Sequence, residues 1–356
     1  MEQLPENVLV RIFSKLHALD IIRAAFSCRS LRAVAISAAH LIPASLVISL
    51  VWKDSMGFPR FWAHDPSRDA WFSLRLDFLS SSPTRYGHLL PSDGGLVCME
   101  EVENINPKSH DYGRSALIIF NPITGSRRRI PYPREVVDPQ AVGIKYNSVS
   151  DGYELFALIR CSWWSHTMLR YAALTSTWRS VASFSVGRGY YVQHGTIVCC
   201  NSVLYTVWKK QNDLRLFSVD GCAVNEVQLP VMQRKYFDSI FLTDVRGILH
   251  MIQPEDDQCL RDICIWKLQN DTKWAVVSRL PDLLKARCQA LGITFSLPCV
   301  GKNGIIYVTL QSVVYFKWYV LMHDIDKHTW SLIGPISTPD FGPSVVIFEP
   351  SLTAIA

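Results

Sequence analysis

Cysteine and histidine are the residues of this chain that could ligate a metal ion or act as nucleophiles, so their spacing is informative. The chain has ten of each type in 356 residues. The cysteines stand at positions 28, 98, 161, 199, 200, 222, 259, 264, 288 and 299, and no pair has the C-x-x-C spacing of zinc and redox sites. The histidines are scattered singly, without the pairing that a copper site needs. We expect no metal ion and no cofactor.

Motifs of the common enzyme classes are also missing. The sequence contains no H-E-x-x-H, G-x-S-x-G, G-x-x-x-x-G-K-[ST] or G-x-G-x-x-G. Gly187 and Gly189, on either side of Arg188, are expected to form a turn rather than a phosphate-binding loop. We therefore expect no catalytic residues and no enzymatic activity.

Charge and the first residues suggest a location. The net charge is only +5, and the one tight basic run, Arg127 to Arg129 with Arg134, is typical of a solvated strand end. We expect no nucleic-acid partner. The start, MEQLPENVLV, carries acidic residues where a secretory signal would carry positive charge. The thiols are then expected to be reduced, and the protein to lie in the cytoplasm, the nucleus or both.

One segment has the hydropathy of a membrane span. No charged residue occurs from Ala33 to Trp52. Pro43 interrupts this segment, and LVISLVW after it is a short β-branched run that suits a buried strand. We expect a strand here and no membrane partner.

The elements that carry these residues are indicated by a repeat. After residue 50, an apolar strand, a polar turn and often a Trp that begins another strand recur about every 50 residues. The turns start near Asp65, Asn121, Ala172, Ser218, Leu268 and Asp324. Each copy predicts a hairpin whose second strand begins at Trp71, Trp178, Trp274 or Trp330 where the Trp is kept.

A second feature has the same period. Small residues followed by an apolar run occur at Gly95, Gly152, Ser202, Gly247 and Gly304. About four short strands fit in each interval, with the small residue where one strand ends and the next begins. Four strands in about 50 residues, repeated, are typical of propeller blades.

This unit resembles a kelch repeat, and FNPITGSRRRIP is similar to the propeller domains that follow F-boxes in plant proteins. The resemblance covers residues 45 to 356. It implies a mainly β protein whose second domain, 45–356, is a six-bladed, kelch-like propeller. The strand SVVIFEP, residues 344 to 350, has no blade of its own, whereas the first copy lacks a strand. We expect this C-terminal strand to complete the first blade and close the ring.

The N-terminal residues predict short amphipathic helices. Leu4, Val8, Leu9, Ile12 and Leu16 keep the spacing of one helix face, which Phe13 widens, and Pro5 is tolerated in the first turn. Asp20 is a plausible N-cap for a second helix, residues 21 to 27, and Ser30 can begin a third. A helical segment of about forty residues cannot bury all these side chains within itself. We therefore expect a partner.

This stretch resembles an F-box, the helical module that binds the Skp-type adaptor of a cullin ubiquitin ligase. The resemblance implies a first domain, 1–44, of three helices. It also implies these adaptor-binding residues: Leu4, Pro5, Val8, Leu9, Ile12, Phe13, Leu16, Ile21, Ile22 and Leu31. The chain departs from the pattern where the usual Pro is His17 or Ala18 and where the usual Trp is Leu31.

The two resemblances together imply the substrate-recognition subunit of an SCF-type (Skp-cullin-F-box) E3 ubiquitin ligase, whose propeller captures a target protein. Two alternatives stay open: a propeller scaffold without a ligase role, and a propeller oxidase. The target site is expected in the long links between the second and third strands of a blade, where loop length varies most. The candidates are Glu103, Lys108, His110, Asp111, Tyr112, Arg114, Glu255, Asp256 and Asp257.

Overall fold

The computed structural model describes residues 4–356 apart from several gaps. Outside the described residues lie 17–19, 22–23, 25–26, 38–46, 54–58, 66–69, 75–84, 103–115, 123, 134–135, 137–138, 148–151, 194–195, 212, 231–239, 255–261, 271–272, 303, 313, 316, 337–343 and 349–355. The chain forms two compact units. Unit 1 comprises residues 1–132, 145–153 and 346–356, and unit 2 comprises 133–144 and 154–345.

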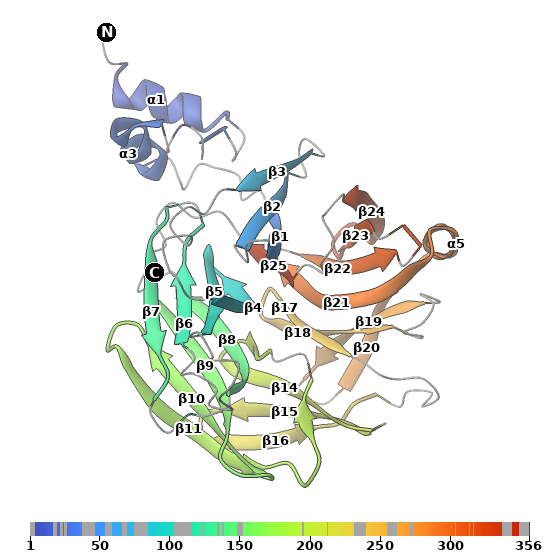
Figure 1. Cartoon of the computed structure of the whole chain (residues 1–356). Coiled ribbons are helices and arrows are strands. Elements are labelled where there is room, and N and C mark those ends of the chain that lie inside the picture. Colours follow the sequence, from blue (N-terminus) through green and yellow to red (C-terminus); the bar gives the residue numbers. More distant parts are fainter. Residues whose placement is uncertain are drawn as a thin grey trace. The chain divides into compact units, whose positions relative to one another are not determined.

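Unit 1 begins with helices that pack on one another (Figure 1). α1 (Glu6–Phe13) follows Pro5, whose fixed φ of −55° suits the position just before a helix. α3 (Arg29–Ser37) begins one residue before the predicted start. Between them Ile21, Ala24 and Ser27 are helical, as predicted for the second helix, whereas Asp20, predicted as its N-cap, is helical as well. Among the described residues, no helix is long and apolar enough to cross a membrane.

Two sheets complete unit 1. The first contains β1 (Val47–Lys53), β2 (Pro59–Asp65) and β3 (Ala70–Leu74), and β25 (Ser344–Phe348) is hydrogen-bonded to the free edge of β1. The second contains β4 (Arg85–Asp93), β5 (Leu96–Val102), β6 (Ala116–Phe120) and β7 (Arg127–Pro131). The strand predicted from LVISLVW is confirmed as β1, and the C-terminal strand pairs where it was predicted to pair.

Unit 2 has four sheets of the same kind (Figure 1). The first contains β8 (Pro139–Asn147), β9 (Gly152–Arg160), β10 (Ser165–Ala172) and β11 (Thr177–Ser185). The second contains β12 (Tyr191–Val192), β13 (Val198–Cys200), β14 (Val203–Lys210), β15 (Asp213–Asp220) and β16 (Ala223–Val227). The third contains β17 (Phe241–Val245), β18 (Ile248–Pro254), β19 (Ile263–Gln269) and β20 (Lys273–Arg279). The fourth contains β21 (Ile293–Lys302), β22 (Ile305–Ser312), β23 (Lys317–Asp324) and β24 (Thr329–Ile336), and α5 (Asp282–Ala290) precedes it.

Burial explains why the second strand of each sheet in unit 2 is almost wholly apolar. Each core cluster is shared by two consecutive sheets, so a middle strand is covered on both faces. In β14, Leu204 to Trp208 are all buried, whereas the outermost β16 is mostly exposed. Four-stranded antiparallel sheets that pack face to face in chain order are propeller blades. The fold is that of a mainly β propeller with few helices.

The hairpin that ends four of the six sheets has the predicted Trp, whereas β7 and β16 have none. Trp71, Trp178, Trp274 and Trp330 are each the second residue of the outermost strand. Two of them also join sheets: the indole N–H of Trp274 donates to the carbonyl of Gln228 at 3.0 Å, and that of Trp330 donates to Ser278 Oγ at 2.8 Å. Trp274 and Trp330 therefore each bond their own sheet to the preceding one.

The small residues of the second repeat lie in tight turns between the first two strands of a sheet. Gly94 and Gly95, Asn201 and Ser202, and Arg246 and Gly247 are pairs with positive φ. Two successive residues of this kind form the type I′ turn that suits the twist of a hairpin. Gly304 has the same conformation, with φ of 84°, whereas Gly152 is the first residue of β9.

Candidate functional site

An exposed apolar stripe runs along α1. Leu4, Val8 and Ile12 are spaced four residues apart and are 54%, 38% and 42% exposed. Within α1, Val8 and Ile12 lie one above the other on one helix face at this spacing, and Leu4 precedes the helix next to Pro5. Large apolar side chains that remain exposed in a row on a helix mark an interaction surface.

The opposite side of α1 belongs to the core of the helices. Phe13 and Ile21 are 3% and 1% exposed and pack with Val34 and Ala35 of α3. Leu9, Leu16 and Leu31 are partly buried against the same cluster. The structure thus divides the predicted adaptor-binding residues: Leu4, Val8 and Ile12 face outward, with exposed Pro5 beside them, whereas Phe13 and Ile21 hold the helices together. Ile22 lies outside the described residues.

Basic side chains border the stripe. Arg11 and Lys15 are exposed, and each lies three residues from a member of the stripe, at Val8 and Ile12. On α1, Arg11 is a neighbour of Val8 at this spacing, and Lys15 lies in the turn that follows the helix. The surface that α1 offers is therefore apolar with a positive rim, which suits a partner whose groove is apolar with an acidic border.

The predicted target-binding residues all lie outside the described residues: Glu103, Lys108, His110, Asp111, Tyr112, Arg114, Glu255, Asp256 and Asp257. They belong to the link between β5 and β6 and to the link between β18 and β19. Both links join the second and third strands of a sheet, as the repeat predicted. The same kind of link is described elsewhere, between β9 and β10, where Trp163 and Trp164 are 76% and 53% exposed. Sequence reasoning missed these two residues, although an adjacent Trp pair outside the repeat was a usable signal.

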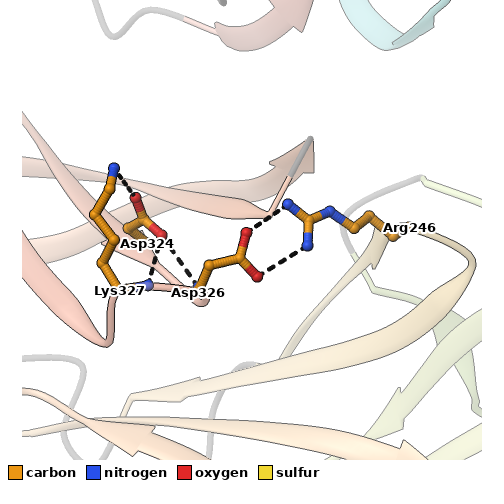
Figure 2. Close-up of polar contacts among 4 residues, drawn as sticks. All are labelled: Arg246, Asp324, Asp326 and Lys327. Atoms are coloured by element: carbon orange, nitrogen blue, oxygen red, sulfur yellow. Dashed lines mark hydrogen bonds and ion pairs between the residues drawn. The ribbon is translucent and has the colours of Figure 1, made fainter.

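The turns at the other ends of the strands carry polar contacts between sheets. Figure 2 shows the Arg246 guanidinium donating two hydrogen bonds to the Asp326 carboxylate, at 2.9 and 2.6 Å. Asp324 accepts from the Lys327 ammonium group at 2.8 Å. Arg246 lies in the turn between β17 and β18, and Asp326 lies in the turn between β23 and β24. Each group holds its partner charged: the guanidinium lowers the pKa of Asp326, and the Asp326 carboxylate raises the pKa of Arg246.

Buried titratable groups are held in their neutral forms. Burial raises the pKa of the Cys98 thiol, and it raises the pKa of the Cys288 thiol to about 11. Burial, with a smaller contribution from the Arg160 charge, lowers the pKa of His166 to about 4. Because the thiolate is the reactive form of cysteine, these two thiols are poor nucleophiles at neutral pH. Within the described part of the chain, no three His, Cys, Asp or Glu side chains are grouped so that they could hold a metal ion.

Comparison with known proteins gives one family match. A family model described as F-box-like matches residues 1–41, and no curated protein matches the chain. Among solved structures, the chain is similar to two proteins assigned as 6-phosphogluconolactonases. The one from Bacteroides fragilis is 12% identical, with a TM-score of 0.47, and the match covers 85% of this chain and 97% of that one. The one from Bacteroides uniformis is 13% identical, with a TM-score of 0.47, and the match covers 85% and 99%.

A third solved structure that the chain resembles is the tricorn protease, at 10% identity and a TM-score of 0.45. That match covers 84% of this chain and 27% of the protease. Identities and TM-scores this low say nothing about what the chain binds or does.

Proposed function

We propose that this protein is the substrate-recognition subunit of an SCF-type ubiquitin ligase. The observation that carries the proposal is the exposed stripe of Leu4, Val8 and Ile12, which lies within the segment that an F-box-like family model matches. An F-box binds the Skp-type adaptor, and through it the cullin ligase. The helices would supply this contact without any chemistry of their own.

The propeller sheets would bind the target protein. Rigid blades that present links of unequal length are suited to binding, because the scaffold holds the links in place at low entropic cost. In this role the chain is a non-catalytic adaptor that acts in the cytoplasm or the nucleus.

We also propose the finer architecture. A helical domain at 1–44 would be followed at 45–356 by a kelch-like propeller, in which the six sheets found in the described residues form six blades of a closed ring. The pairing of β25 with β1 supports closure, because a strand from the C-terminus completes the sheet that begins the propeller.

Charge substitution on the stripe tests the proposed function. Ile12→Asp and Val8→Asp each place a carboxylate where an apolar interface must form, and an unpaired buried charge costs several kcal/mol. We expect co-purification with the Skp-type adaptor to be lost while the melting temperature stays unchanged. Leu9→Asp is a poorer test, because Leu9 packs on the helix core and its substitution would also unfold the helices.

Leu174→Asp is the matched control. Leu174 is 76% exposed in the turn between β10 and β11, so the same change there introduces a charge without touching the helices. Wild-type yields of adaptor with Ile12→Asp would overturn the proposal. If even the wild-type chain binds no adaptor, the chain is an interaction scaffold without a ligase role.

A further inference from the structure

Exposed aromatic and basic side chains gather in the loops at one end of the strands in the first two sheets of unit 2. The members of this aromatic-basic patch are Trp163, Trp164, Arg188, Tyr190, Tyr191 and Lys210. Trp163, Trp164 and Tyr191 are 76%, 53% and 52% exposed, and Arg188 and Lys210 are also exposed. Tyr190 is partly buried among basic side chains. Exposed tryptophan is uncommon on a protein surface without a binding role.

Backbone and ring contacts connect the segments that carry the patch. The link 161–164 reaches the next segment where the Val186 N–H donates to the Trp164 carbonyl at 3.4 Å. That segment then joins the neighbouring sheet as β12, in which Tyr191 pairs with Lys209 of β14. The Tyr190 ring lies 5.5 Å from Lys210 Nζ and 4.8 Å from the guanidinium carbon of Arg215. Figure 1 shows the strands concerned, β9, β10, β14 and β15, in neighbouring sheets.

The charge of this loop region is net positive, although Arg215 nitrogens lie 3.5 Å from Asp213 Oδ2 and 3.8 Å from Glu226 Oε2 of β16. Residues 160–165, 186–192 and 209–215 contain five basic side chains, Arg160, Arg188, Lys209, Lys210 and Arg215, and one acidic side chain, Asp213. The guanidinium carbon of Arg160 lies 5.6 Å from the Trp163 ring, so the positive charge extends to the exposed tryptophans.

We propose that the aromatic-basic patch is the site where the propeller binds an acidic segment of a target protein that also carries apolar side chains. Trp, Tyr and Arg are the residue types that contribute most at protein interfaces, and basic side chains at the rim select an acidic partner. A nucleic acid is the other anionic partner that a basic patch can bind, and the comparison with oligo-dT described below distinguishes it from an acidic peptide. The proposal rests on the proposed function only in naming the bound protein as the ligase target.

Part of the patch lies in the kind of link in which the target site was predicted. Link 161–164 and the turn at Gln211 both join the second and third strands of a sheet, as do the links that carry Glu103 and Glu255. The patch thus lies in the predicted class of link, but it contains none of the nine residues that were predicted to bind the target.

The test measures fluorescence anisotropy of a labelled peptide of alternating Glu and Leu or Phe with the full chain. A peptide with Gln in place of Glu and a single-stranded oligo-dT serve as comparison probes. We expect the acidic peptide to bind, added salt to weaken binding, and the two comparison probes to bind at least about tenfold more weakly. Equal binding of the neutral peptide, tighter binding of oligo-dT, or no binding of the acidic peptide would each overturn the proposal.

Two pairs of variants locate the site. Trp163→Ala combined with Trp164→Ala should weaken peptide binding about tenfold or more, whereas Leu174→Ala, at an equally exposed side chain on the other edge of the same sheet, should leave it unchanged. Arg188→Glu should weaken binding, whereas Lys273→Glu, at an exposed residue of β20, should not. Unchanged melting temperatures confirm that the variants fold. Patch variants that bind the peptide like the wild type would overturn the proposal.

Adaptor binding, measured on the same preparations, separates this proposal from the proposed function. Loss of peptide binding with adaptor binding intact supports the patch as the target site. If peptide binding depends on the patch but the chain binds no adaptor, the patch is supported as a peptide-binding site and the ligase role is overturned.

Discussion

At the scale of single residues, His166 couples the propeller core to pH. Its ring is 2% exposed and lies edge-on to the Trp208 ring, with centroids 4.5 Å apart. Burial lowers its pKa to about 4, so the folded protein holds the ring neutral at a pH where an exposed His would be protonated. His250 and His323 are also buried, and burial lowers the pKa of each.

The sign of the pH dependence follows from this shift. Between about pH 6.5 and pH 4 the unfolded chain binds a proton at this residue and the folded chain does not, so the free energy of unfolding falls as the pH falls. We expect urea midpoints to be lower at pH 5 than at pH 7, with a loss from His166 of up to about 3 kcal/mol near pH 4. His166→Phe removes the titration and should reduce the difference between the two midpoints. Identical pH dependence in the variant and the wild type would contradict the assignment of this effect to His166.

At the scale of elements, the type I′ turns fix where hairpins begin. A Cβ on Gly247 would lie 2.3 Å from Asn201 Oδ1, while Asn201 Nδ2 donates to the Gly247 carbonyl at 2.6 Å. Gly247 therefore combines a positive φ with a close contact between two sheets. Gly221, in the turn between β15 and β16, has a positive φ with nothing within 4 Å of such a Cβ.

The two glycines form a matched pair for mutation. Gly221→Ala should lower the free energy of unfolding by about 1 kcal/mol through backbone strain alone. Gly247→Ala should lower it by about 2 kcal/mol, because the Asn201 side chain must also move and lose its hydrogen bond. In an Asn201→Ala background the excess cost at Gly247 should disappear. Equal costs at the two positions in urea unfolding would show that the contact between the sheets contributes nothing.

The elements that recur in the sequence were the ones that could be predicted from it. Gly247 marks a turn because the positive φ of the backbone there favours glycine, and the Trp positions mark where the next strand begins, so the strands followed from sequence alone. α5 was not predicted, because its nine residues have no apolar face of their own and only Cys288 is buried. The inner strand of the second sheet in unit 2 was also not foreseen as two pieces, β12 and β13.

The candidate sites were predicted less completely. The spacing of α1 identified an apolar face, but it could not show that Phe13 packs inward on Val34 of α3, because that contact joins residues distant in sequence. Trp163 and Trp164 were missed because tryptophan is highly buried on average. Exposure depends on the whole fold, which a local pattern does not contain.

At the scale of the whole molecule, β25, the last described strand of the chain, joins the first strand, β1, in one sheet. Deleting residues 344–356 would leave the edge of β1 unpaired, and exposed strand edges aggregate. We expect a lower melting temperature and soluble aggregates by size-exclusion chromatography. Deleting only residues 349–356 keeps Ser344–Phe348 and should have a much smaller effect. Equal melting of the two truncations and the wild type would show that β25 does not stabilise the propeller.

The most direct test of the ligase role is calorimetric titration of a purified Skp-type adaptor into the full chain. The exposed stripe on α1 predicts a complex of one adaptor per chain, with a negative heat-capacity change from apolar burial, and no measurable binding by Ile12→Asp. Absence of binding by the folded wild-type chain, or the same affinity for Ile12→Asp, would contradict the account.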